Sequence, residues 1–179
     1  MCGEKKIDKD NVKCNQEETQ KCDQKESLQC DQQYMRIALD YARQAAREGE
    51  VPIGAVVVDP CGSIIGVGYN RVEQSITQTA HAEMIALAQA AQAYGDWRLE
   101  NCLLYVTLEP CSMCSGAVRL SRLKGIVYGA TSHLFGSHLD KDCFIPLYSN
   151  NAPFLKGGVC EKESVEILRE FFQNKRKQK

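Results

Sequence analysis

Residues 103–130 read LLYVTLEPCSMCSGAVRLSRLKGIVYGA, and this stretch decides which fold the chain adopts. The apolar run LLYVTL at 103–108 predicts a buried strand, residues 111–122 predict a helix, and GIVYGA at 125–130 predicts a second buried strand. Two buried strands separated by a helix indicate parallel neighbours joined by a helical crossover. The stretch therefore predicts an α/β domain.

The elements outside this stretch extend the same pattern. Tyrosines and alanines at helical spacing predict an amphipathic helix from Tyr34 to near Gly49. Two β-branched runs within 53–70 flank the turn sequence DPCG at 59–62 and predict a hairpin. Two further helices are predicted at 81–94 and 162–173. The order α-β-β-α-β-α-β-α favours a three-layer α-β-α sandwich with a mixed central sheet.

The composition is typical of one globular domain preceded by a polar tail. The chain has 179 residues, 44% of them hydrophobic, and a net charge of −1. Residues 1–32 contain few large apolar side chains and an imperfect octapeptide repeat, in which Cys14, Cys22 and Cys30 recur at regular intervals. Such a segment cannot offset the entropy that it would lose on ordering. We therefore expect a mobile polar tail over 1–32 and a folded domain over 33–179.

Sequence features also bear on location and partners. The longest aliphatic run is Ala55–Val58, far shorter than a membrane span, and the charged N-terminus lacks the apolar region of a signal peptide. We therefore expect a cytoplasmic protein without membrane contact. In that compartment ten cysteines indicate metal binding or free thiols rather than disulfides. The basic sequence KRKQK at 175–179 fits either a phosphate contact or a solvated terminus.

Candidate metal ligands gather in the motifs HAE and PCSMC. His81, Cys111 and Cys114 supply the imidazole and thiolate donors that zinc prefers, and a catalytic zinc site uses three protein ligands. Pro110 fits a first helical turn, and the helix N-termini are expected to lower the pKa of both thiols. Glu83 lies two positions from His81, which is about 200° around a regular helix. Both can approach one metal only where the helix begins irregularly.

Three kinds of site fit these motifs. A structural zinc site needs a fourth ligand, for which His133, His138 or Cys143 could serve. A thiol redox pair needs the C-x-x-C spacing but has no use for the histidine or for Glu83. A hydrolytic zinc site uses a carboxylate to take a proton from water and return it to the substrate. Glu83 therefore favours the hydrolytic site.

The two motifs together also carry a family resemblance. H-x-E with P-C-x-x-C is the known signature of zinc-dependent nucleobase deaminases. From Tyr34 to the C-terminal helix, the chain resembles the bacterial tRNA-specific adenosine deaminases of the TadA type, in the cytidine deaminase-like superfamily. The matching stretches are VPIGAVVV, GYNR, TAHAEMIAL, LYVTLEPCSMCSGA, IVYGA and EFF. The resemblance implies that superfamily's fold, a homodimer, one Zn²⁺ per chain, and conversion of the wobble adenosine of a tRNA anticodon to inosine.

The resemblance also implies roles for individual residues. Those that would hold zinc are His81, Cys111 and Cys114. Glu83 would move protons, Asn70 of GYNR would contact the flipped nucleoside, and Phe172 of EFF would contact the anticodon loop. The chain departs from the family at 131–140, where the loop is shorter and Ser132 stands in place of an aspartate. In the family this loop lies beside the substrate.

The sequence leaves three functions open. The first is an RNA adenosine deaminase, and the second is a deaminase of free cytosine, guanine or a nucleoside with the same zinc chemistry. The third is a zinc-bearing partner subunit without catalytic activity, against which Glu83 argues. The basic C-terminus and the sequence TLEPCxMCxGA favour the first function.

Overall fold

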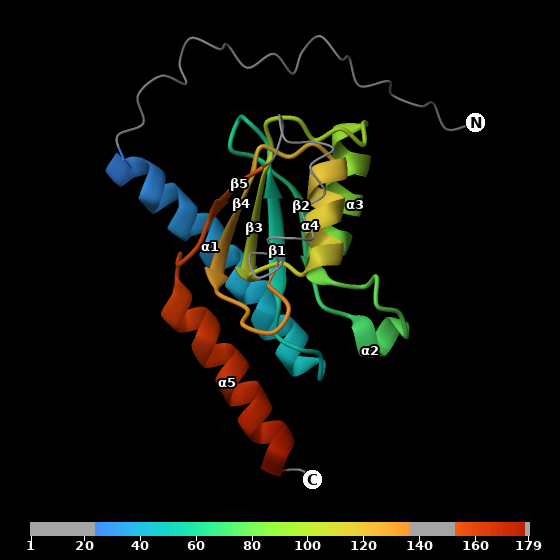
Figure 1. Cartoon of the computed structure of the whole chain (residues 1–179), viewed down its shortest axis with the longest axis vertical. Coiled ribbons are helices and arrows are strands. Elements are labelled where there is room, and N and C mark those ends of the chain that lie inside the picture. The colour runs from blue at the N-terminus through green and yellow to red at the C-terminus, as the bar shows by residue number, and fades with distance from the viewer. Residues whose placement is uncertain (1–23, 137–152, 178–179) are drawn as a thin grey trace, which may run out of the picture.

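The computed structural model describes residues 24–136 and 153–177. Its centre is a five-stranded sheet in the order β2-β1-β3-β4-β5 (Figure 1). The strands are β1 (Gly54–Val58), β2 (Ile64–Tyr69), β3 (Leu103–Leu108), β4 (Gly125–Ala130) and β5 (Phe154–Lys156). Strand β1 pairs antiparallel with β2 and β3, whereas β4 pairs parallel with β3 and β5. The mixed sheet predicted from the sequence is confirmed.

Helices cover both faces of this sheet. They are α1 (Gln24–Arg47), α2 (Val72–Ser75), α3 (Ala82–Tyr94), α4 (Ser112–Leu120) and α5 (Glu161–Lys177). Helices α1 and α5 pack on one face, while α3 and α4 pack on the other (Figure 1). Alternate strand residues divide between the two cores: Val56 and Tyr105 pack under α1, and Val57 and Leu104 under α3. The predicted three-layer α-β-α sandwich is therefore confirmed.

Helix α1 is longer than its apolar pattern predicts. It begins at Gln24 rather than near Tyr34, so residues 24–32 of the expected mobile tail lie in a helix. Residues 1–23 of that tail lie outside the described residues. The sequence did not indicate this extension, because the segment has too few large apolar residues to show a helical period.

A buried polar cluster holds the start of α1 against the sheet. The carboxylate of Asp31, which is 7% exposed, accepts a hydrogen bond from the Tyr105 hydroxyl on β3 (2.8 Å). It also accepts one from Lys156 Nζ on β5 (2.7 Å). Burial and the hydrogen bond to Asp31 raise the pKa of the Tyr105 phenol, so this hydroxyl remains a donor. Asp31 thus joins three elements that are far apart in the sequence.

We expect Asp31→Ala to lower the free energy of unfolding by about 1–3 kcal/mol, because the Tyr105 hydroxyl is left buried without its acceptor. The measurement is urea denaturation at neutral pH. Asp40→Ala in the same helix is the matched control, because Asp40 forms an exposed ion pair with Arg43 and such pairs contribute little. Equal unfolding midpoints for the two variants would contradict the anchoring role of Asp31.

The hairpin prediction is confirmed, whereas two short elements were not predicted. The Gly62 N–H donates to the Asp59 carbonyl (3.0 Å), and the Asp59 side chain accepts from the N–H groups of Cys61 and Ser63, which closes the turn between β1 and β2. The missed elements are α2, which buries no residue, and β5, which is too short to show an alternating pattern.

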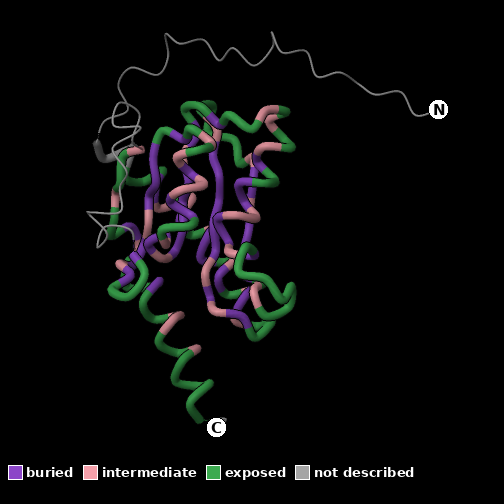
Figure 2. The backbone as a smooth tube through the Cα atoms, turned by 45° about the vertical axis from the view of Figure 1, so that its right-hand side comes forward, coloured by how far each residue is buried: buried purple, intermediate pink, exposed green. Residues whose placement is uncertain are grey.

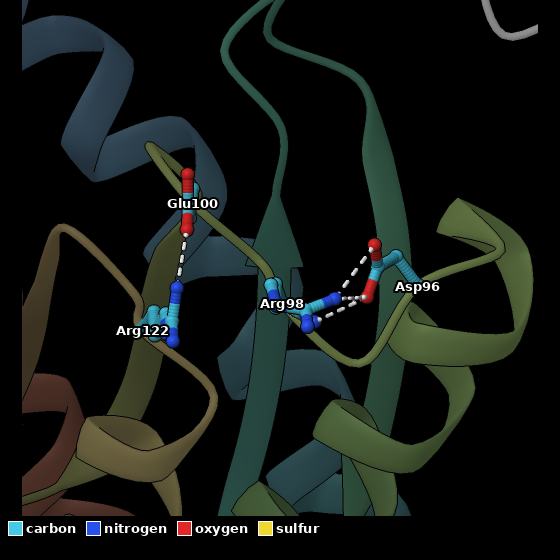
Figure 3. A network of polar contacts seen from close by, with 4 residues as sticks. All are labelled: Asp96, Arg98, Glu100 and Arg122. Atoms are coloured by element: carbon cyan, nitrogen blue, oxygen red, sulfur yellow. Dashed lines mark hydrogen bonds and ion pairs between the residues drawn. The ribbon is translucent and has the colours of Figure 1, made fainter.

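A network of surface side chains joins the segment that follows α3 to the turn that follows α4. Arg98 forms an ion pair with Asp96 (3.3 Å) and Arg122 forms one with Glu100 (3.1 Å) (Figure 3). The two guanidinium groups also lie 4.4 Å and 5.4 Å from the centroid of the Trp97 ring. The network lies at the end of α3 that is remote from His81, so it supports the scaffold rather than the candidate site.

The burial pattern separates the core from the C-terminal helix. Buried residues concentrate in the sheet and on the inner sides of the helices, while the C-terminal part of α5 is exposed and projects from the body (Figure 2). Among the helices in the described part of the chain, none combines the length and hydropathy needed to cross a membrane.

Candidate functional site

Helix α3 packs close to β2 because both contact surfaces consist of small residues. Ala82 and Ala86 face the sheet and are fully buried. A Cβ atom at Gly66 would overlap the Ala86 carbonyl, and one at Gly68 would overlap the Ala82 carbonyl, so neither strand position accepts a larger residue. This packing fixes the N-terminal end of α3, where His81 lies.

The two metal-ligand motifs occupy equivalent positions at the starts of two helices. His81 is the N-cap of α3 and Cys111 is the N-cap of α4, both with extended backbone angles and without a side-chain capping bond. Cys114 lies in the first turn of α4 and is fully buried. Pro110 precedes the N-cap, so its expected place in the first helical turn is corrected: α4 begins at Ser112, one residue later than predicted.

The structure brings His81, Cys111 and Cys114 together. Nδ1 of His81 lies 3.7 Å from Sγ of Cys111 and 3.5 Å from Sγ of Cys114, and the three ligand atoms all lie within 4.8 Å of one another. Zinc bonds of about 2.3 Å to sulfur and about 2.0 Å to nitrogen at tetrahedral angles place the two atoms roughly 3.5 Å apart. The cluster therefore has both the donor types and the spacing that Zn²⁺ requires.

The alternative of a structural site with a fourth protein ligand receives no support from the described residues. His133 is exposed, and within the ranges that the structure describes no other acidic residue, histidine or cysteine joins the cluster. The other two candidates, His138 and Cys143, lie outside the described residues. Three ligands leave one coordination position for water, which is the arrangement of a catalytic zinc site.

Glu83 lies beside the cluster because α3 begins irregularly. His81 has extended backbone angles (φ −69°, ψ 150°), so it precedes the helix and the expected 200° separation from Glu83 does not apply. The Glu83 carboxyl is 3% exposed and interacts with His81, Cys111 and Cys114. Its Oε2 atom is buried without a hydrogen-bond partner. A buried oxygen without a hydrogen-bond partner is costly, and here it belongs to a carboxyl that interacts with all three candidate ligands.

The acid–base state of the cluster differs from the expectation that both thiols are acidic. A hydrogen bond from Cys114, assisted by His81, lowers the pKa of Cys111 to about 4. The hydrogen bond to Cys111 and burial raise the pKa of Cys114, because two adjacent thiolates would repel each other. The hydrogen bond to Cys111 raises the pKa of His81, and burial raises the pKa of Glu83. Zinc binding must therefore displace the proton of Cys114.

In the zinc-free protein, we expect iodoacetamide to label Cys111 well below the pH at which an ordinary thiol reacts, because its pKa of about 4 makes it a thiolate at pH 6. Cys102 is the internal control, since it is fully buried and burial raises its pKa to about 11. The measurement is peptide mass spectrometry after labelling between pH 5 and pH 8, with and without zinc. Labelling of Cys111 that rises only toward pH 9, or that zinc does not suppress, would contradict this assignment.

Asn70 lies at the entrance to α3. It is 5% exposed, its N–H donates to the Ile53 carbonyl (3.0 Å), and its Oδ1 accepts a hydrogen bond from the Ala82 N–H (3.0 Å). The bond from the Ala82 N–H places Asn70 at the first residue of α3, which lies between His81 and Glu83 in the chain.

Ser132 lies in a turn that is anchored on Glu109. Glu109 is 3% exposed, and its Oε2 accepts a hydrogen bond from the Ser132 N–H (3.1 Å). Ser132 accepts bonds from the N–H groups of Phe135 (3.3 Å) and Gly136 (3.0 Å). Because β3 and β4 are parallel neighbours, this turn and the Cys111 loop leave the sheet at the same edge. Residues 137–140 of the 131–140 loop lie outside the described residues.

Phe172 is the one predicted site residue that the structure keeps apart from the cluster. It lies on α5, is 45% exposed, and stacks edge to face on Phe171 with ring centroids 5.4 Å apart. Lys175 Nζ lies 5.4 Å from the centroid of the Phe171 ring, so aromatic and basic side chains share this end of α5. Such a surface suits nucleobases and phosphates.

Two buried acidic residues at the site were not predicted from the sequence. Glu50 is 1% exposed and accepts hydrogen bonds from two backbone N–H groups of α2, and Glu109 holds the Ser132 turn. Glu50 stands in no motif, and Glu109 belongs to the matching stretch LYVTLEPCSMCSGA without a role assigned from it. Their partners are backbone groups that only the folded chain brings near.

Comparison with known proteins is consistent with this geometry. A family model described as the cytidine and deoxycytidylate deaminase zinc-binding region matches residues 28–130. A tRNA-specific adenosine deaminase of Haemophilus influenzae is 42% identical over 146 residues, which cover 81% of this chain and 84% of that protein.

Two solved structures share the fold. One, from work on A-to-I editing by tRNA:A34 deaminases at the wobble position of transfer RNA, is 39% identical with a TM-score of 0.70 and covers 76% of this chain and 99% of that one. The other is a guanine deaminase from Nitrosomonas europaea, 25% identical with a TM-score of 0.70, which covers 78% of this chain and 83% of that one.

Proposed function

Because the chain belongs to the family of zinc-binding cytidine and deoxycytidylate deaminases, we propose that it is a hydrolytic deaminase that converts the wobble adenosine of a tRNA anticodon to inosine and releases ammonia. The observation that carries the proposal is the buried Oε2 of Glu83, which has no hydrogen-bond partner and lies beside three converging zinc ligands. The tRNA substrate is supported by the relative from Haemophilus influenzae and by the tRNA:A34 deaminase structure.

The proposed chemistry assigns one task to each group. His81, Cys111 and Cys114 hold zinc, which when bound activates water for attack at neutral pH. Glu83 takes a proton from that water as its oxygen forms a bond to C6 of the flipped adenine. Glu83 gives this proton to ring nitrogen N1. It then takes the second proton from the hydroxyl on C6 and gives it to the amino group, so that the carbonyl at C6 forms as the bond from C6 to the amino nitrogen breaks and ammonia leaves. Adenosine and water thus become inosine and ammonia.

Substrate contacts are assigned to Asn70 and Phe172. The Asn70 oxygen is held by the Ala82 N–H, so the amide nitrogen is the group that we propose donates to the nucleoside. Phe172, with the basic residues at the end of α5, is proposed to contact the anticodon loop. Bases of an anticodon loop are already unpaired, so presenting one to the site costs less than extracting it from a duplex.

We also propose that the protein is a cytoplasmic homodimer. The cytoplasmic location is proposed because the proposed substrate is a tRNA. The dimer is supported by an apolar stripe on the outer face of α4, where Met113 and Leu120 are 37% and 68% exposed, two turns apart on one side of the helix. Sedimentation equilibrium should then give twice the 20.0 kDa mass of the chain.

A deaminase of a free base is the second candidate function, because the guanine deaminase from Nitrosomonas europaea has the same fold. The two functions share the zinc site and differ in whether the substrate needs an RNA surface. The exposed aromatic and basic end of α5 favours the RNA substrate, since a free base has no use for it.

The test compares an anticodon stem-loop bearing a wobble adenosine with free adenosine, cytosine and guanine. The matched control is the same stem-loop with its adenosine moved by one position. The zinc-loaded protein is incubated with each, and inosine is scored by mass spectrometry together with released ammonia. We expect inosine in the wobble RNA alone. Turnover of a free base with the RNA untouched would support the second function, and no turnover by zinc-loaded protein would overturn both.

A further inference from the structure

Glu50 follows α1 in a connection of defined backbone geometry. Gly49 adopts a left-handed conformation (φ 81°), and the N–H groups of Gly49 and Glu50 donate to the carbonyls of Ala46 (3.1 Å) and Ala45 (3.0 Å). These two bonds form a Schellman motif, in which glycine is favoured because other residues are strained at positive φ. The motif fixes the direction of the chain at Glu50, whose side chain is buried.

The Glu50 carboxylate binds the loop between β2 and α3, which we call the 71–80 loop. Oε1 accepts a hydrogen bond from the Gln74 N–H (2.8 Å), and Oε2 accepts one from the Glu73 N–H (3.2 Å). Glu50 is 1% exposed, so water competes little for these charge-assisted bonds. Both oxygens of one buried side chain are thus used to hold this loop.

Apolar burial does little to hold the 71–80 loop. Helix α2 buries no residue, and Ile76, at a left-handed φ of 50°, is 91% exposed. The side-chain bond from Gln74 to Glu48 (2.9 Å) is exposed to solvent, where such contacts contribute less. The position of the loop therefore depends chiefly on the buried carboxylate of Glu50.

Both ends of the 71–80 loop belong to the candidate site. Asn70 directly precedes the loop and His81 directly follows it, while the Arg71 N–H donates to the Ala80 carbonyl (3.0 Å) and ties the two ends together. A shift of the loop therefore moves the proposed nucleoside contact relative to a zinc ligand. A displacement of about 1 Å in an active site can lower activity by about a hundredfold.

We infer that Glu50 is a positioning residue: its carboxylate holds the 71–80 loop and thereby sets the position of Asn70 against the zinc centre. Glu50 does not touch the reacting atoms and is not a zinc ligand. The inference rests on the proposed deaminase function for its effect on catalysis. Its structural part, the anchoring of the loop, can be measured independently of any substrate.

The experiment compares Glu50→Ala and Glu50→Gln with the wild type in the full-length, zinc-loaded chain. Glu73→Gln is the matched control, because it makes the same change of charge on the loop itself while the Glu73 backbone N–H keeps its bond to Glu50. Three quantities are measured: zinc content, amide hydrogen exchange of residues 72–80, and kcat and KM for the anticodon stem-loop. Melting temperatures monitor folding.

We expect Glu50→Ala to accelerate exchange in the loop at least tenfold, to keep zinc, and to raise KM about tenfold or more. Glu50→Gln should fall between Glu50→Ala and the wild type, because its amide has one oxygen for two N–H donors. Glu73→Gln should match the wild type. A purely structural role would reduce the folded fraction and the apparent kcat without raising KM.

Several results would overturn the inference. One is that amide hydrogen exchange of residues 72–80 in Glu50→Ala is as slow as in the wild type. Another is that this exchange becomes faster while KM stays unchanged. If Glu50→Ala does not fold, a Glu50→Gln variant equal to the wild type in exchange and KM would also overturn it. A wild-type protein that does not deaminate the RNA but turns over a free base would overturn the proposed RNA substrate. The Glu50 variants are then compared with the wild type by their KM for that base.

Discussion

Replacement of Glu83 by alanine or glutamine should lower kcat about 10²- to 10⁴-fold, the usual contribution of a general acid–base group, while zinc stays bound. The zinc ligands do not include Glu83, so the metal content should remain one per chain. Neither variant should melt earlier than the wild type, because each removes a buried carboxyl whose Oε2 has no hydrogen-bond partner. Loss of activity without loss of stability separates a proton shuttle from a structural carboxylate.

The measurements for Glu83 are single-turnover deamination of the stem-loop, zinc by elemental analysis, and a thermal melt. Glu73→Gln serves again as control, since it removes an exposed carboxylate close in sequence to the site. Glu83→Gln keeps the size and polarity of the side chain but cannot accept a proton from water. Wild-type turnover by Glu83→Gln would exclude the proton-shuttle role.

Replacement of Cys114 by alanine should remove zinc and abolish activity. Cys114 is fully buried and its sulfur lies 3.5 Å from His81 Nδ1, so no neighbouring solvent-exposed group can take its place in the cluster. Loss of bound metal also removes its stabilisation of the folded state, which is about 4 kcal/mol when zinc exceeds its dissociation constant a thousandfold. The melting temperature of this variant should therefore no longer respond to added zinc.

Elemental analysis and melts with and without added zinc measure this effect. Cys61→Ser is the matched control, because Cys61 lies exposed in the hairpin turn far along the chain from the ligand motifs. It should keep zinc and activity. A Cys114→Ala protein that retained one zinc per chain would show that the ligand set has been assigned wrongly.

Much of the candidate site follows from local sequence. The strand-helix-strand stretch 103–130 and the apolar runs of its strands predicted the sheet and its two helical layers, because burial on both faces requires apolar residues throughout each strand. His81, Cys111 and Cys114 could be predicted as ligands because zinc selects the type of donor atom. Glu83 could be predicted because hydrolysis requires a base.

The tertiary structure decided what depends on partners remote in the chain. Asp31 anchors the N-terminal part of α1 by binding Tyr105 and Lys156, and Glu50 holds the 71–80 loop through backbone N–H groups. Neither contact leaves a periodic signal in the sequence. The fold also decided that, of the two motif thiols in the metal-free cluster, Cys111 has the lowered pKa and Cys114 the raised one, since the proximity of two sulfurs outweighs the helix ends. By itself the sequence determined the donor atoms and the strands and helices, which depend on residue type and spacing. Their distances, burial and protonation were left to the fold, because those properties belong to pairs of residues that meet only after the chain has closed.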